Sequence, residues 1–105
     1  MTNALLVLCT HPDADDAEAL ARTLVGERLA ACVNVLPLMT SIYPWRGEIQ
    51  REQEHQLVIK TRAGAFDALA ARICELHPYD VPEVIAVPVT HGLAAYLNWI
   101  DESTS

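Results

Sequence analysis

Basic residues are scarce in this chain. Seven lysines and arginines stand against fourteen aspartates and glutamates, which gives a formal charge of −7 and a pI near 4.8. Because no basic stripe is present that could neutralise phosphates, we expect no nucleic-acid partner. An acidic surface concentrates cations, but most acidic proteins are simply soluble, so the charge alone does not indicate metal binding.

Long hydrophobic runs are also missing. The longest apolar run, Ala4–Cys9, is too short to cross a bilayer, and the segment before it lacks the positive charge of a secretory signal. We therefore expect a cytoplasmic protein without a membrane segment. Cysteines are few: Cys9, Cys32 and Cys74 are an odd number inside apolar periodic segments. That setting is typical of reduced thiols in a cytosolic core, so we expect no disulfide framework.

The patterns that usually mark an enzyme are absent. The sequence has no glycine-rich phosphate loop, no nucleophile elbow and no closely spaced set of Ser, His and Asp, so we expect a protein without catalytic activity. It also has no Gly, Ser or Pro tract that would mark a linker or a disordered segment. Residues 1–105 are therefore expected to form a single domain.

The apolar periodicity predicts the element order β-α-β-β-α-β followed by a helix. The continuous run Ala4–Cys9 predicts a central strand covered on both faces. Asp13 is expected to cap a first helix that ends near Arg28. The other expected elements are two hairpin arms within Ala31–Thr61, a helix from Phe66 to Leu76, a strand from Glu83 to Val89 and a helix from Ala94 to Glu102.

The stretch Ala31–Thr61 predicts one β-hairpin whose arms are too long for the domain around them. Each arm of about fifteen residues spans near 45 Å at ~3.3 Å per residue, whereas a helix of about fourteen residues covers about 21 Å. Pro37 should interrupt the first arm and place it at an edge, and Gly47 should take positive φ in the turn. The outer part of the hairpin carries four apolar residues: Ile42, Tyr43, Trp45 and Ile49. They would form an exposed patch on a monomer, so we expect an obligate oligomer.

Right-handed crossovers would place the first and third strands in the middle of the sheet, flanked by the second and fourth, with two helices on one face. The expected fold is therefore an α+β, ferredoxin-like sandwich. Its other face is bare unless the long hairpin, the last helix or other subunits cover it. Three subunits meeting sheet to sheet would bury the most surface.

Several separate motifs resemble one known family. They are Glu27–Asn34, Ser41-Ile42-Tyr43 with Trp45, Ile59-Lys60-Thr61, His77-Pro78-Tyr79 with Val81-Pro82-Glu83, and Tyr96-Leu97 with Trp99-Ile100. With aligned spacing from about Leu5 to Ile100, the chain closely resembles the CutA divalent-cation tolerance proteins. The resemblance implies a ferredoxin-like subunit, a homotrimer like that of the PII signalling proteins, a cytoplasmic location, and a link to copper and other divalent ions.

The resemblance also implies a metal site. Copper-site proposals for the family fall on Cys9 and His77 here, but Leu76 stands where some members have a second histidine, so one candidate ligand is missing. Leu38 replaces a glycine common after the preceding proline, and Pro44 separates Tyr43 from Trp45. The bend of the hairpin is expected to differ accordingly.

The residues themselves leave alternatives open at each candidate position. Thiolate and imidazole suit copper or zinc, and Cys9 would share one side of its strand with His11, but a buried thiol ordinarily serves packing. His77 at a helix C-terminus could bind metal or interact with the helix dipole. Cys32 could be a reactive thiol, yet no neighbouring cation is visible in the sequence.

Two further groups of side chains have both a structural and a functional interpretation. Tyr43, Trp45 and Trp99 suit subunit contacts, although Trp99 would equally suit the core. Glu52, Glu54 and Glu83 could bind hard cations, but charges on a polar strand face are usually just solvated.

The sequence thus predicts a cytoplasmic homotrimer that binds a divalent metal, copper among the candidates, at Cys9 and His77 and contributes to metal-ion tolerance without catalysis. The alternative is a PII-like trimeric signalling or binding module with a small ligand in the clefts between subunits. A third interpretation is a structural scaffold for other proteins.

Overall fold

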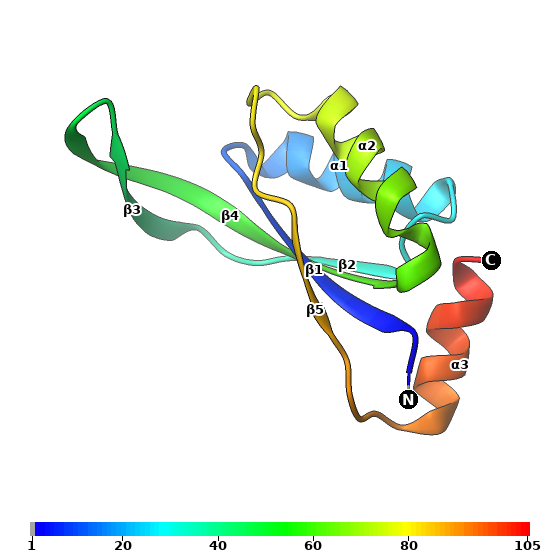
Figure 1. Cartoon of the computed structure of the whole chain (residues 1–105). Coiled ribbons are helices and arrows are strands. Elements are labelled where there is room, and N and C mark those ends of the chain that lie inside the picture. The colour runs from blue at the N-terminus through cyan, green and yellow to red at the C-terminus, as the bar shows by residue number, and fades with distance from the viewer. Residues whose placement is uncertain (1) are drawn as a thin grey trace.

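A computed structural model describes residues 2–105, and Figure 1 shows its arrangement of strands and helices. The strands are β1 (Ala4–His11), β2 (Cys32–Val35), β3 (Met39–Trp45), β4 (Glu48–Arg62) and β5 (Ile85–Pro88). The helices are α1 (Ala14–Gly26), the 3-10 turn η1 (Ala63–Ala65), α2 (Phe66–Leu76) and α3 (Ala94–Ser103). Among these described residues, no helix is long and apolar enough to cross a membrane.

The strands form one antiparallel sheet in the order β2-β4-β1-β5, and β3 pairs with the outer half of β4. The two inner strands are β1 and β4, with Val7 of β1 opposite Ile59 of β4 and Ala86 of β5. Both α1 and α2 lie on one side of this sheet, and α3 lies at one end of it (Figure 1). A mixed α+β fold with an antiparallel sheet is therefore confirmed.

Local sequence signals explain where the helices lie. Asp13 has extended backbone angles, and its Oδ2 accepts a hydrogen bond of 2.9 Å from the N–H of Asp16, so the predicted cap of α1 is confirmed. Each helix turns an apolar side toward the sheet, with Leu20 and Leu24 of α1 buried beside Ile73 of α2. The structure ends α1 at Gly26, slightly earlier than predicted, because the backbone leaves helical geometry before the left-handed Arg28 (φ 62°).

The hydrophobic core fills only the space between the sheet and the two helices. Its strand residues are fully buried and alternate along β1 and β4: Val7, Cys9, Leu57 and Ile59. A smaller cluster joins α3 to the end of the sheet, where Ile100 packs against Ala4 and Ala31. Since side chains alternate across a strand, the residues between these core positions point to the opposite face.

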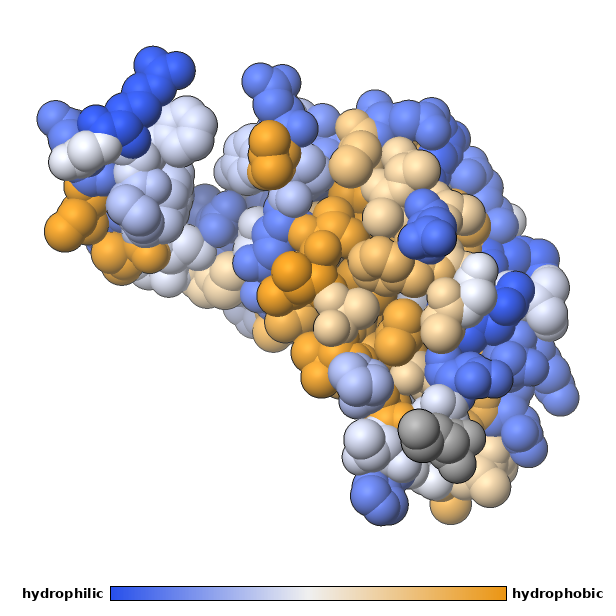
Figure 2. Space-filling model, in the orientation of Figure 1, coloured by the Kyte–Doolittle hydropathy of each residue, from blue (hydrophilic) through white to orange (hydrophobic). Residues whose placement is uncertain are grey.

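That opposite face, here called the open face, is apolar and uncovered in the single chain. It comprises Leu6 and Leu8 of β1, Val58 of β4, and Ile85 and Val87 of β5, which are cross-strand neighbours. Ile85 and Val87 are 54% and 49% exposed, and Figure 2 shows the hydrophobic patch over β1 and β5. The prediction that Ala4–Cys9 is covered on both faces is therefore wrong for one chain, because no helix or strand among residues 2–105 packs on the middle of this face.

The long hairpin projects from the body and makes the molecule 45 Å long against 25 and 24 Å in the other directions. Its return arm, β4, is a single strand of 15 residues, as expected. The first arm is not continuous: it is split into β2 and β3 around Pro37, which has no N–H to donate to a ladder. The turn has Arg46 at φ 50° and Gly47 at φ 80°, which confirms the positive φ predicted for Gly47.

The other two predicted elements are found with changed bounds. The last strand covers four residues, Ile85–Pro88, and not Glu83 to Val89, because its pairing with β1 reaches only from Leu8 to Leu5. It lies at the edge of the sheet, a position that suits Pro88 because proline has no N–H to donate to a further strand. The last helix continues to Ser103, one residue beyond its predicted end.

Candidate functional site

The chemistry-bearing side chains gather where β1 ends. His11 is the last residue of β1, and His77 directly follows α2, so both histidines precede a proline that closes the element. They are almost fully buried, with 2% and 7% of their surface exposed. Their ring centroids lie 4.9 Å apart at an angle of 56°. The fold therefore brings together two imidazoles that are far apart in the sequence.

The nitrogen atoms of the two rings have defined partners. The backbone N–H of Asp13 donates to His11 Nδ1 and that of Tyr79 donates to His77 Nδ1, both at 3.1 Å. His77 Nε2 donates to the carbonyl oxygen of Thr10 at 2.6 Å. An Nδ1 that accepts must be unprotonated, so in a neutral ring the proton is on Nε2. Both histidines therefore have the Nε2–H tautomer, and both nitrogens of His77 are occupied.

The environment of His11 disfavours its charged form. Burial lowers the pKa of His11 from its usual 6.5, and the neighbouring His77 adds to this effect. The negative charges of Asp16 and Asp13 oppose the shift. The first cause dominates because the ring is enclosed by the end of β1 and the start of α1.

Cys9, the other predicted ligand, lies within the core. Its side chain is fully buried, and Sγ donates to the carbonyl oxygen of Thr10 at 3.6 Å. Burial raises the pKa of the Cys9 thiol to about 12, and nearby Glu83, Cys74 and Glu54 contribute. Because thiolate is the form that binds soft metals, this position holds a neutral thiol in the metal-free chain. Cys9 and His77 thus meet at one backbone oxygen.

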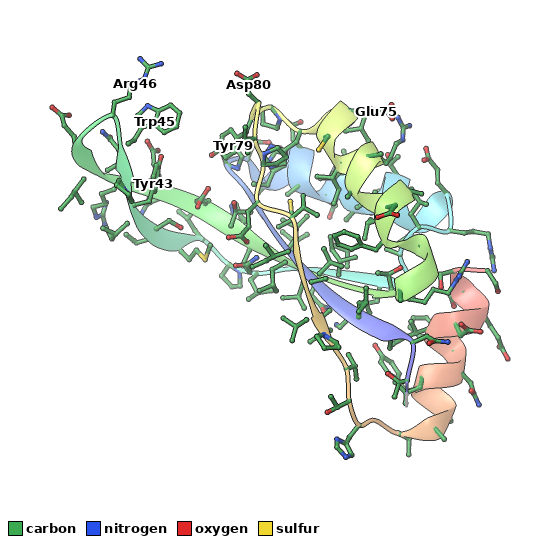
Figure 3. The ribbon with its side chains drawn as sticks, viewed as in Figure 1. Tyr43, Trp45, Arg46, Glu75, Tyr79 and Asp80 are labelled. Atoms are coloured by element: carbon green, nitrogen blue, oxygen red, sulfur yellow. The ribbon has the colours of Figure 1, made fainter. Side chains whose placement is uncertain are left out.

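A tyrosine connects the histidines to the base of the hairpin. The ring of Tyr79 lies 4.8 Å from that of His77, and its hydroxyl donates to Glu54 Oε1 at 3.4 Å. Figure 3 shows Tyr79 and Asp80 on the loop before β5, next to the hairpin. Burial, followed by the charge of Glu54, raises the pKa of the Tyr79 hydroxyl. Glu54 is buried, so the expectation that it is merely solvated is wrong, whereas Glu52 and Glu83 are exposed.

A second polar group lies on the same side of the sheet as the open face. Cys32 of β2 is directly opposite Lys60 of β4, and Lys60 Nζ is 3.9 Å from Cys32 Sγ. The same ammonium group donates to Asn34 Oδ1. The expectation that Cys32 has no neighbouring cation is therefore wrong. Sequence reasoning missed Lys60 because only the register of two strands makes these residues neighbours.

The predicted aromatic contacts all lie at the surface. Trp45 and Tyr43 are on the hairpin, where the guanidinium of Arg46 lies 5.5 Å from the centre of the Trp45 ring (Figure 3). Trp99 is half-exposed on α3 and lies 5.5 Å from the ring of Tyr96. In the single chain, Trp99 is therefore not a core residue.

Within residues 2–105, no three His, Cys, Asp or Glu side chains converge in a way that could hold a metal ion. The Nδ1 lone pairs of the two histidines are not free to bind a metal, because each Nδ1 accepts a hydrogen bond from a backbone N–H. The arrangement at the end of β1 is thus a hydrogen-bonded cluster in which both imidazole Nδ1 atoms already have backbone partners. The ligand role predicted for Cys9 and His77 stays a prediction.

Known proteins share this architecture along nearly its whole length. A divalent-cation tolerance protein CutA from Thermus thermophilus is 48% identical over 99 residues, covering 94% of this chain and 96% of the relative. The crystal structure of CutA from Xylella fastidiosa matches with a TM-score of 0.97 and 48% identity, covering 99% of this chain and 100% of that one. CutA1 from Oryza sativa matches with a TM-score of 0.96 and 41% identity, covering 99% and 95%.

A model of one protein family gives the same result. The family described as CutA1 divalent ion tolerance protein matches residues 5–103, from the second residue of β1 to the end of α3. With relatives close to half identical over nearly the full length, this match leaves one conclusion. The chain belongs to the CutA1 divalent ion tolerance family.

Proposed function

We propose that this protein contributes to divalent-cation tolerance as a cytoplasmic homotrimer and catalyses no reaction. The names of its relatives support the tolerance function. The strand order and the two helices on one side of the sheet support a ferredoxin-like subunit. The single observation that carries the assembly is the open face, an apolar sheet surface without a cover.

The exposed apolar residues are too many and too clustered for an isolated subunit. The open face joins five apolar side chains on three neighbouring strands, and the projecting hairpin exposes Ile42, Trp45 and Ile49, the last to 82%. Soluble monomers rarely expose continuous apolar surfaces of this kind. Copies of the same chain are the natural cover, because every copy has both surfaces to bury.

The two edges of the sheet favour a closed ring of copies. β2 is unpaired on one side and β5 on the other, so each subunit offers two different strand edges. Contacts between unlike surfaces generate a ring when the rotation closes. A ring of three follows from the resemblance to trimeric proteins stated above.

The assembly is tested with variants of the open face. Light scattering on purified wild-type protein should give three subunit masses, and Val87→Asp should give smaller species because a charge would be buried. Val81→Asp is the matched control, since Val81 is an exposed valine in the loop before β5. A single-subunit mass for the folded wild type would contradict the proposal.

Tolerance is tested in a bacterial strain that lacks its own member of the family. Wild-type protein should restore growth in added copper, zinc or cobalt, and Val87→Asp should restore it less at equal protein level. Equilibrium dialysis with metal analysis compares wild type with the Cys9→Ala, His77→Ala pair, and Cys74→Ala is the control. An unchanged metal stoichiometry in the double variant would show that Cys9 and His77 are not the ligands.

The cytoplasmic location needs its own experiment, because a relative from Archaeoglobus fulgidus is described as a periplasmic divalent cation tolerance protein. Fractionation of the native host with compartment markers should recover this chain with cytoplasmic markers. Recovery with periplasmic markers would reject this part of the proposal.

A second candidate function is a binding module for a small anion between subunits. Lys60 favours it, because its ammonium group, bonded to Asn34, is a cation on an otherwise largely apolar side of the sheet. Phosphate or ATP should then raise the melting temperature in a saturable way in the presence of chelator. Lys60→Met should lose the effect, and no rise in the wild type would exclude these two ligands.

A further inference from the structure

Two His-Pro-X segments of this chain form the same local turn. In His11-Pro12-Asp13 and in His77-Pro78-Tyr79, the imidazole Nδ1 accepts the backbone N–H two residues later, in both cases at 3.1 Å. The proline favours extended geometry in the residue before it, and His77 has φ −81° and ψ 142°. This geometry lets the ring turn back over its own proline toward that N–H.

The two turns are interlocked. Their rings lie 4.9 Å apart, and His77 Nε2 donates to the carbonyl of Thr10, the residue before His11. The first turn leads into α1, whose cap is Asp13, and the second leads into the loop before β5. These contacts therefore join the end of β1, the start of α1 and the loop 77–84.

The same hydrogen bonds set the chemistry of the rings. A histidine that binds metal through Nε2 needs its lone pair there and normally donates its other N–H to a carbonyl or carboxylate. Here the other nitrogen, Nδ1, accepts from a backbone N–H, and Nε2 carries the proton. For His77 to bind metal, it would have to break its turn or its bond to Thr10.

We propose that these two turns form one clasp, defined as His11, Pro12, Asp13, His77, Pro78 and Tyr79 with the bond to Thr10, in which both imidazoles are neutral Nε2–H tautomers. The clasp holds the start of α1 and the loop 77–84 to the end of β1, and it keeps divalent metal off both rings. The proposal opposes the ligand role predicted for His77. It leaves the trimer and the tolerance function unaffected, so either can fail alone.

The tautomers are read directly from the wild-type assembly. Long-range ¹H–¹⁵N correlation spectra of uniformly ¹⁵N-labelled protein near neutral pH should give the Nε2–H pattern for His11 and His77. Addition of equimolar Zn²⁺, and of Cu⁺ without oxygen, should leave these signals unchanged. An Nδ1–H pattern for either ring, or a metal-induced shift of its nitrogen signals, would overturn the proposal.

The mechanical part is tested by hydrogen exchange. His77→Asn keeps a side-chain acceptor for the N–H of Tyr79, as in an Asx turn, but removes the ring contact and the bond to Thr10. If the clasp joins the segments, amide exchange should rise roughly threefold to tenfold in the first turn of α1 as well as in loop 77–84. His91→Asn, at an exposed histidine, is the control. Faster exchange confined to the loop 77–84 would refute the coupling.

Discussion

Replacing Val87 by alanine should weaken the assembly of subunits while each subunit stays folded. Val87 lies on the open face opposite Leu6 and keeps 49% of its surface exposed in the single chain. The substitution removes two methyl-sized groups at about 0.8 kcal/mol each, and about half of this area is still to be buried on assembly. The loss is about 0.8 kcal/mol per subunit and about 2.4 kcal/mol for the three subunits of the proposed trimer, or roughly 60-fold in the association constant.

Sedimentation equilibrium over a dilution series measures this constant. Where the wild type is too tight for the accessible range, urea applied equally to both proteins brings dissociation into it. Val81→Ala makes the same chemical change in an exposed loop and should leave the constant unaltered. Equal constants for Val87→Ala and wild type, with both proteins folded by circular dichroism, would refute burial of the open face between copies.

Three further predictions concern single side chains. Because burial lowers the folded-state pKa of His11 below its usual 6.5, the unfolded chain binds more protons below that pH, so stability should fall as the pH drops through 6.5. Urea midpoints in wild type and His11→Asn test this, and an equal pH dependence in both would contradict it. The Cys9 thiol, with a pKa of about 12, should not react with a thiol reagent at neutral pH in the folded protein, whereas exposed Cys74 reacts at once. Rapid labelling of Cys9, detected by mass spectrometry, would contradict this prediction. Asp13→Ala removes the cap of α1 and should cost about 1 kcal/mol in denaturant unfolding, against little for Asp15→Ala.

Features that depend on near neighbours in the chain could be predicted from the sequence. Asp13 caps α1 because its side chain needs only the N–H of Asp16, and Gly47 takes positive φ because a tight turn requires it. Pro37 divides the first arm of the hairpin because a proline has no N–H to donate to a neighbouring strand, whatever the surrounding fold. Each of these effects has its cause within a few residues.

Features that depend on register or on packing between distant segments could not be predicted. The pairing of Cys32 with Lys60 follows from the alignment of β2 with β4, which no local pattern fixes. The contact between His11 and His77 needs the whole fold, and only there do their nitrogens acquire partners. The run Ala4–Cys9 correctly indicated two apolar faces, but a sequence does not say whether the second cover belongs to the same chain.

β4 has a consequence for mechanics, because one unbroken strand is both the centre of the sheet and the outer arm of the hairpin. A force applied near Ile49 travels along a continuous backbone to Ile59, which is fixed in the core between β1 and β2. The projecting arm is therefore a lever with its fulcrum inside the subunit. A contact that holds the tip of the hairpin therefore also restrains the twist of the sheet. Conversely, a change in that twist would move the tip.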